Sequence, residues 1–266
     1  MIEHYFRPQT PEQALELMHA HSPHAVWFNG GSKLNAAPTR TDKTVAIALS
    51  DLPCNDIRCE GEALYLGAMC KLQALIEHEL TPAALKDAAG FVYSRHIRHQ
   101  ATLGGEIAAK QDEAVLLPAL LAMHAELILA DGQQVSLEAY LDNPGALILE
   151  VVLPQRAIHC HTRSVRRSAG GLAVITAAVS LSADGKVEML LDGMNQLGER
   201  QARPVSLRDV AGQALEGEAL ERAVAEAISP VADIRGSIEY KRYIAGVVMA
   251  DLLVECQQLA QSTQGE

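Results

Sequence analysis

The pattern of apolar and polar positions in the first half of the chain predicts alternating short strands and helices. Thr10 at a cap position, with Pro11 directly after it, predicts the start of a helix whose apolar stripe begins at Ala14 and Leu15. Asp131-Gly132 between two apolar runs predicts a hairpin, because this dipeptide favours a tight turn. We further expect strands at residues 25–28, 45–49, 63–68, 126–130, 133–135 and 147–153, and helices at 71–80, 82–90 and 115–123.

The pattern changes after residues 154–161, which we therefore take as a domain boundary. Beyond it the chain alternates as strands and then becomes helical. Residues 261–266 look like a loose tail. We expect strands at 163–167, 172–181 and 187–191, and helices at 207–215, 217–228 and 237–259.

Size and composition narrow the class of protein. The 266 residues suffice for two modest domains or one large one, with 48% hydrophobic and 21% charged residues, an ordinary globular balance. A formal charge of −11 argues against nucleic acid or an anionic membrane as the main partner. We see no secretory signal and no uninterrupted apolar run of roughly 18 residues, so a cytoplasmic location is expected.

Two glycine pairs are the first candidates for chemistry. Gly30-Gly31 follows an apolar run, and Gly104-Gly105 follows Arg95 and Arg98. Glycine allows positive φ and close approach to the backbone, and successive N–H groups in such a turn can bind an anion. A plain tight turn is the alternative for each pair. Neither loop is G-x-G-x-x-G or a P-loop, but two such loops could hold one diphosphate from two sides.

The motifs around these pairs resemble a known family. Residues 29–34 (N-G-G-S-K-L) are similar to its A-G-G-T-x-L loop, and residues 97–108 (I-R-H-Q-A-T-L-G-G-E-I-A) to its I-R-N-x-A-T-I/L-G-G-N-I/L-A loop. Residues 117–125 match its L-P-x-L-L-A-L-D-A segment, residues 2–17 its Arg-Pro entry, and residues 239–253 its closing helix. The chain thus resembles the flavin-binding subunit of the molybdenum hydroxylases, such as xanthine dehydrogenase and carbon monoxide dehydrogenase.

This resemblance implies an α+β fold. It would comprise a two-subdomain FAD-binding domain of the vanillyl-alcohol-oxidase or PCMH type at 1–156, with subdomains at about 1–54 and 55–156. A smaller domain with a three-stranded antiparallel sheet and helices would follow at 157–260. The implied function is electron transfer through FAD, an oxidoreductase role. The implied partners are a molybdopterin-binding large subunit and a 2Fe-2S small subunit.

By the same resemblance, the two loops should bind FAD mainly through backbone N–H groups. The hydroxyls of Ser32 and Thr102 can donate to phosphate oxygens, and Lys33 can neutralise charge. The matching positions are Trp27, Phe28, Asn29, Gly30, Gly31, Ser32, Lys33, Leu34, Thr102, Leu103, Gly104, Gly105 and Glu106.

Three positions depart from the family pattern. Glu106 stands where the family has Asn, and an ionised carboxylate repels a phosphate at close range. Val115 and Val174 stand where the family has an Asp and a Lys that contact the flavin nucleotide and ring. These departures motivate the alternative of a scaffold subunit that has lost or weakened flavin binding.

The remaining features carry less chemistry. Histidines cluster near residues 19–24, 96–99 and 159–161, where surface and loop positions are a better interpretation than a metal site. The five cysteines form no C-x-x-C pair and no iron–sulfur spacing, so any cluster would belong to another chain. Arg166-Arg167 could contact a phosphate or a partner, or simply end a strand. No nucleophile elbow or acid–base arrangement supports an independent flavin enzyme.

Overall fold

Residues 2–34, 41–109, 114–154, 158–195 and 203–264 are described by a computed structural model of the chain. They divide into two units, each built from separate stretches of sequence. The first unit consists of Met1–Leu80, Ser94–Ala109 and Ala125–Pro154. The second unit consists of Thr81–Tyr93, Lys110–His124 and Gln155–Glu266.

The first unit begins with a small parallel sheet in the order β1-β3-β2. Helix α1 packs against β2 and β3. The side chain of Thr10 accepts a hydrogen bond from the backbone N–H of Gln13, and Pro11 is the first helical residue, which confirms the predicted start of α1. The elements are β1 (His4–Phe6), α1 (Pro11–His21), β2 (Ala25–Phe28) and β3 (Val45–Ala48).

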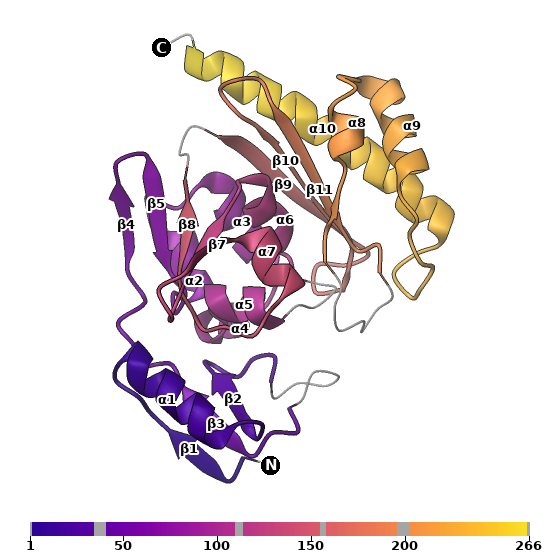
Figure 1. The fold of residues 1–266 in the computed structure, drawn as a ribbon. Helices are drawn as coiled ribbons and strands as arrows, with labels where there is room; N and C mark the ends of the chain where they lie inside the picture. Colours follow the sequence, from indigo (N-terminus) through magenta and orange to yellow (C-terminus); the bar gives the residue numbers. More distant parts are fainter. Residues whose placement is uncertain (1, 35–40, 110–113, 155–157, 196–202, 265–266) are drawn as a thin grey trace. The chain divides into compact units, whose positions relative to one another are not determined.

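A five-stranded antiparallel sheet in the order β4-β5-β8-β6-β7 forms the rest of the first unit (Figure 1). The predicted hairpin at Asp131-Gly132 is confirmed, with Gly132 at φ +83°. The strands are β4 (Ile57–Glu60), β5 (Ala63–Gly67), β6 (Glu126–Leu129), β7 (Gln134–Ser136) and β8 (Ile148–Leu153). The helices are α2 (Leu72–Glu77), α4 (Arg95–Gln100), α5 (Leu103–Ala109) and α7 (Leu137–Asp142).

The second unit contains an antiparallel sheet in the order β12-β11-β10-β9. The three expected strands are present as β9 (His159–Arg166), β10 (Ala173–Leu181) and β11 (Val187–Asp192). The expectation of a three-stranded sheet is wrong, because a fourth strand, β12 (Val205–Ser206), pairs with β11. Two residues are too few to produce a detectable period-2 pattern, so the sequence does not signal this strand.

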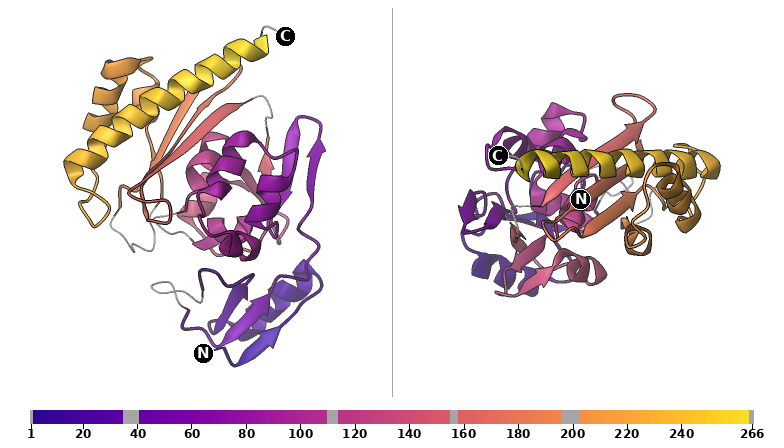
Figure 2. Two further views of the ribbon diagram at one scale, coloured as in Figure 1. Left: turned by 180° about the vertical axis from the view of Figure 1, so that it is seen from behind. Right: turned by 90° about the horizontal axis from the view of Figure 1, so that it is seen from above.

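Helices from both halves of the chain cover this sheet. Helix α10 lies along β9 and β10, whereas α3 packs on β9 and α6 on β9, β10 and β11 (Figure 1; Figure 2). Strand β10 therefore has eight consecutive buried residues, because both of its faces are covered. The helices are α3 (Ala83–Gly90), α6 (Leu117–Ala122), α8 (Arg208–Ala211), α9 (Gly217–Ala227) and α10 (Ile238–Gln264).

Helix α10 exceeds its expected length. It continues to Gln264, beyond the expected end at residue 259, so residues 261–264 are helical rather than loose. Over Ile238–Ser262 it is long and apolar enough to cross a membrane by length and composition alone, with 44% of the most apolar window buried. The core helix of a globular domain meets the same criterion, and α10 packs on α9 and on the sheet.

Candidate cofactor-binding site

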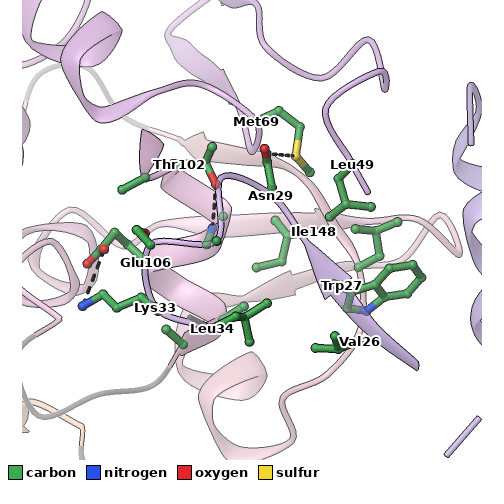
Figure 3. Close-up of a pocket in the computed structure, with 18 of the residues that line it drawn as sticks. Val26, Trp27, Asn29, Lys33, Leu34, Leu49, Met69, Thr102, Glu106 and Ile148 are labelled. Carbon is green, nitrogen blue, oxygen red and sulfur yellow. Dashed lines mark hydrogen bonds and ion pairs between the residues drawn. The ribbon is translucent and has the colours of Figure 1, made fainter. Parts of the chain in front are cut away.

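Both glycine-containing segments border one cavity in the first unit (Figure 3). The cavity encloses about 220 Å³. Its apolar wall includes Val26, Leu34, Leu49 and Ile148, and its polar groups come mainly from the two glycine-containing segments. A mostly apolar cavity with a few converging polar groups is the usual form of a small-molecule site.

The first glycine pair has the backbone conformation that the sequence predicts. Gly30 and Gly31 both have positive φ, +68° and +69°, which side chains other than glycine rarely adopt. A Cβ added to Gly30 would lie 2.1 Å from the backbone oxygen of Gln100. Glycine at position 30 therefore allows the loop after β2 to reach the end of α4, and so brings the two segments together.

The second glycine pair differs from the expected turn. Gly104 and Gly105 lie in the first turn of α5 and lack positive φ, so the turn interpretation is wrong. Their N–H groups have internal acceptors: Gly104 donates to the oxygen of Ala68 at 2.8 Å, and Gly105 to Oγ1 of Thr102 at 3.2 Å. A Cβ on Gly104 would lie 2.9 Å from that of Ala68. In this structure Gly104 allows close packing of α5 against the segment after β5, whereas a Cβ on Gly105 would lie 2.9 Å from Oγ1 of Thr102.

Most of the candidate residues lie around this cavity. Its lining includes Trp27, Asn29, Gly31, Ser32, Lys33, Leu34, Thr102, Gly104, Gly105 and Glu106. Three candidates are placed elsewhere: Phe28 stacks edge-on against Tyr5, Gly30 faces Gln100, and Leu103 is fully buried in the core. The roles of all these residues in binding a cofactor stay a prediction.

Other lining residues escaped the sequence analysis. Ala101, Ala108 and Ala109 flank the second glycine pair in the sequence. The others belong to segments that carry no glycine pair, so only the tertiary structure brings those residues to the cavity. Trp27 shows how one of these segments is held, since its Nε1–H donates to the oxygen of Gly145 at 3.2 Å. The lining residues that sequence reasoning missed include Met69, Ala101, Ala108, Ala109, Tyr140, Gly145, Ala146 and Leu147.

Val115 and Val174, the other two departures from the family pattern, are buried in the second unit. Val174 belongs to a hydrophobic cluster that includes residues of β10, β11 and α10. Neither side chain can form a hydrogen bond.

Glu106 is a buried carboxylate at one edge of the cavity. Its side chain is 2% exposed, and its Oε1 lies 3.7 Å from Nζ of Lys33 (Figure 3). Its Oε2 is buried without a hydrogen-bond partner. Burial raises the pKa of the Glu106 carboxyl, and the charge of Lys33 offsets only part of this effect. The positive charge of Lys33 is therefore directed at Glu106.

The Glu106→Gln variant is expected to be more stable than the natural protein at pH 7, by about 1 kcal/mol. A carboxyl whose pKa is raised by folding contributes stability below its unfolded pKa, about 4.5, and this contribution is lost as the pH rises through the folded pKa. Glutamine cannot ionise, so this part of the pH dependence should disappear. Urea unfolding at several pH values measures both effects.

The exposed Glu62, in the turn between β4 and β5, provides the matched control. Glu62→Gln should leave the unfolding free energy at pH 7 within about 0.5 kcal/mol of that of the natural protein. A Glu106→Gln variant that is less stable than the natural protein at pH 7 would show instead that the ion pair with Lys33 outweighs the cost of burial.

The chemistry of the cavity fits a dinucleotide cofactor. Ser32, Thr102 and Asn29 offer hydroxyl and amide donors for phosphate or carbonyl oxygens, while the apolar wall can cover an aromatic ring. Glu106 is the one lining group of the wrong charge, and its pairing with Lys33 limits that conflict. Among the described residues, no three His, Cys, Asp or Glu side chains are placed to hold a metal ion.

Comparison with known proteins identifies the class. Residues 1–156 match the model of the family described as FAD binding domain in molybdopterin dehydrogenase, and the chain belongs to this family. The resemblance read from the glycine loops is thereby confirmed.

Three relatives illustrate the match. The uncharacterized protein YgfM of Escherichia coli (strain K12) is 51% identical over 97% of this chain and 98% of its own. The carbon monoxide dehydrogenase medium chain of Afipia carboxidovorans is 30% identical over 73% of this chain and 74% of its own. A chain of carbon monoxide dehydrogenase from Hydrogenophaga pseudoflava, at 20% identity, superposes with a TM-score of 0.84 over 97% of this chain and 98% of that one. The mixed helix-and-sheet fold is therefore shared along nearly the whole chain.

Proposed function

We propose that this chain binds FAD between its two glycine-containing segments and serves as the electron-transfer subunit of a molybdenum hydroxylase. The observation that carries the proposal is the convergence of residues 29–34 and 102–106 on one cavity, in a chain of the FAD-binding family. A bound flavin would supply the redox chemistry. The residues of this chain would bind it, orient it and limit its contact with water.

We infer the finer architecture from the same family. Residues 1–156 would form a two-subdomain FAD-binding domain of the vanillyl-alcohol-oxidase or PCMH type, and residues 157–260 a C-terminal flavoprotein domain. The family match that ends at residue 156 supports this boundary.

The proposed partners are a molybdopterin-binding large subunit and a 2Fe-2S small subunit, in the cytoplasm. Electrons would leave a substrate on the large subunit, pass through the clusters of the small subunit and reach this chain. The name of a relative, a medium chain of carbon monoxide dehydrogenase, supports a place among several subunits. The scatter of the free cysteines over Cys54, Cys59, Cys70, Cys160 and Cys256 agrees with clusters carried by another chain.

The proposal is tested in two steps. The purified chain should acquire a flavin absorption spectrum when FAD is added, and keep it through desalting. A tagged copy isolated from its own cells should carry molybdenum and iron by elemental analysis, in constant ratio to flavin. Retained flavin without molybdenum or iron in the assembly would refute the role as a hydroxylase subunit.

A scaffold that has lost flavin binding is the second candidate, and the buried Glu106 carboxylate favours it. It predicts a colourless protein that still assembles with molybdenum- and iron-containing partners. Restoring the family's Asn by a Glu106→Asn substitution should then recover FAD binding. If the natural chain already retains FAD, the scaffold interpretation is wrong.

A further inference from the structure

The side chain of Asn29 lies at the wall of the cavity, and its amide NH₂ has only a weak hydrogen-bond acceptor. Its Oδ1 lies 3.3 Å from Nζ of Lys71, and its Nδ2 donates to Sδ of Met69 at 2.8 Å (Figure 3). A thioether sulfur is a weak acceptor. The amide nitrogen therefore has a partner that a ligand oxygen could replace with a gain in hydrogen-bond strength.

Lys71 determines which way this amide points. An ammonium group has donors and no acceptor, so the amide oxygen must face Lys71 and the NH₂ must face the opposite side, toward Met69. Lys71 is itself held, because its Nζ also donates to the oxygen of Gln100 at 3.1 Å and its backbone bridges to Thr102. It thus connects both segments that border the cavity.

Several other charged and polar groups at this edge already have partners. Lys33 lies against Glu106, and the N–H groups of Gly104 and Gly105 donate to internal acceptors. A diphosphate bound here would bring two negative charges into a mostly apolar cavity, where each charge needs a donor or a cation. Asn29, with Lys71 behind it, supplies a donor and a nearby positive charge.

We propose that the Asn29 amide donates a hydrogen bond to a phosphate oxygen of the bound dinucleotide, in place of its contact with Met69. Lys71 would be the positioning residue that fixes the orientation of this amide and so acts through Asn29. This proposal rests on the proposed function, since it assumes that the cavity receives a dinucleotide. It adds a side-chain anchor to a loop expected to bind through its backbone.

The test compares the binding of three probes, FAD, ADP and riboflavin. ADP carries a diphosphate without flavin, and riboflavin carries flavin without phosphate. Dissociation constants measured by calorimetry should rise about 10-fold for FAD and ADP in Asn29→Ala and in Lys71→Gln. The constant for riboflavin should not change. Asn29→Asp should weaken FAD binding further, because a carboxylate cannot donate and repels phosphate.

Two comparisons separate a role of Lys71 in orienting Asn29 from a nonspecific loss of structure in the variants. If Lys71 acts through Asn29, Lys71→Gln should add little in the Asn29→Ala background, and Lys71→Arg should restore part of the affinity. Matched controls are Asn55→Ala, at an exposed site, and Lys43→Gln, a half-buried lysine that donates to the oxygen of Pro23. Both controls should bind FAD like the natural chain, and all variants should keep its melting temperature within a few degrees.

Each outcome decides the question. Natural affinity for FAD in Asn29→Ala, or an equal loss for riboflavin, would overturn the role of Asn29 while the proposed function stands. Additive losses in the double variant would overturn the role of Lys71 alone. A natural chain that binds neither FAD nor ADP would overturn this inference together with the proposed function.

Discussion

Substitution of Gly30 by alanine is expected to abolish retention of FAD and to lower the free energy of unfolding by at least about 2 kcal/mol. Two costs combine at this position. A residue with a Cβ at φ +68° is strained by about 1–2 kcal/mol. The added Cβ would also lie 2.1 Å from the oxygen and 2.8 Å from the carbonyl carbon of Gln100. Backbone atoms cannot rotate away, so the loop after β2 must separate from the end of α4 and distort the cavity wall.

Gly132, in the hairpin between β6 and β7, separates these two costs. Its φ is also positive, +83°, but a Cβ there would meet no atom within 4 Å. Gly132→Ala should therefore lose about 1 kcal/mol and retain FAD. Visible absorption after desalting and urea unfolding measure both quantities. Full flavin retention by Gly30→Ala would contradict the close approach of the two segments and their joint role in binding.

Substitution of Gly246 by alanine is expected to destabilise the second unit by about 2 kcal/mol, although alanine is the better helix former. Gly→Ala inside a helix normally gains about 1 kcal/mol. Here a Cβ would lie 2.5 Å from the oxygen of Glu221 and 3.0 Å from its Cα, because α10 and α9 approach at this point. Overpacking against backbone costs about 1–3 kcal/mol or more, and at 2.5 Å the clash should outweigh the gain in helix propensity.

The matched control is Gly90→Ala, at the end of α3 in the same unit, where a Cβ would meet nothing within 4 Å. This variant should be neutral or slightly more stable than the natural chain. Scanning calorimetry of both variants measures the difference, and hydrogen exchange should locate the loss of protection in α9 and α10. Equal stabilisation by both substitutions would disprove the close contact between these two helices.

Local chemistry was sufficient wherever a few neighbouring residues determine the conformation. The side-chain cap of Thr10 and the fixed φ of Pro11 start α1 without help from the rest of the chain. Asp131-Gly132 likewise forms its own turn. The motifs of the two glycine-containing segments were enough to identify the family, since they are specific and occur in the right order.

The elements that the sequence did not reveal are all short. The strands β1, β4 and β12 and the helices α4, α5 and α7 contain seven residues or fewer, so none shows a clear period. For the second glycine pair, a turn and the first turn of a helix are equally open to glycine in the isolated sequence. The contact of Gly104 with Ala68, which lies in a separate segment 36 positions earlier in the chain, selects the helix.

By itself, the sequence determined the family, the main helices and strands, and ten of the 21 residues that border the cavity. Only the tertiary structure decided how these residues are used. It showed that Lys33 faces Glu106, that Lys71 orients Asn29, and that α3 and α6 cover the sheet of the second unit. The physical reason is that burial, charge pairing and desolvation depend on which segments meet in space, and sequence spacing does not encode those meetings.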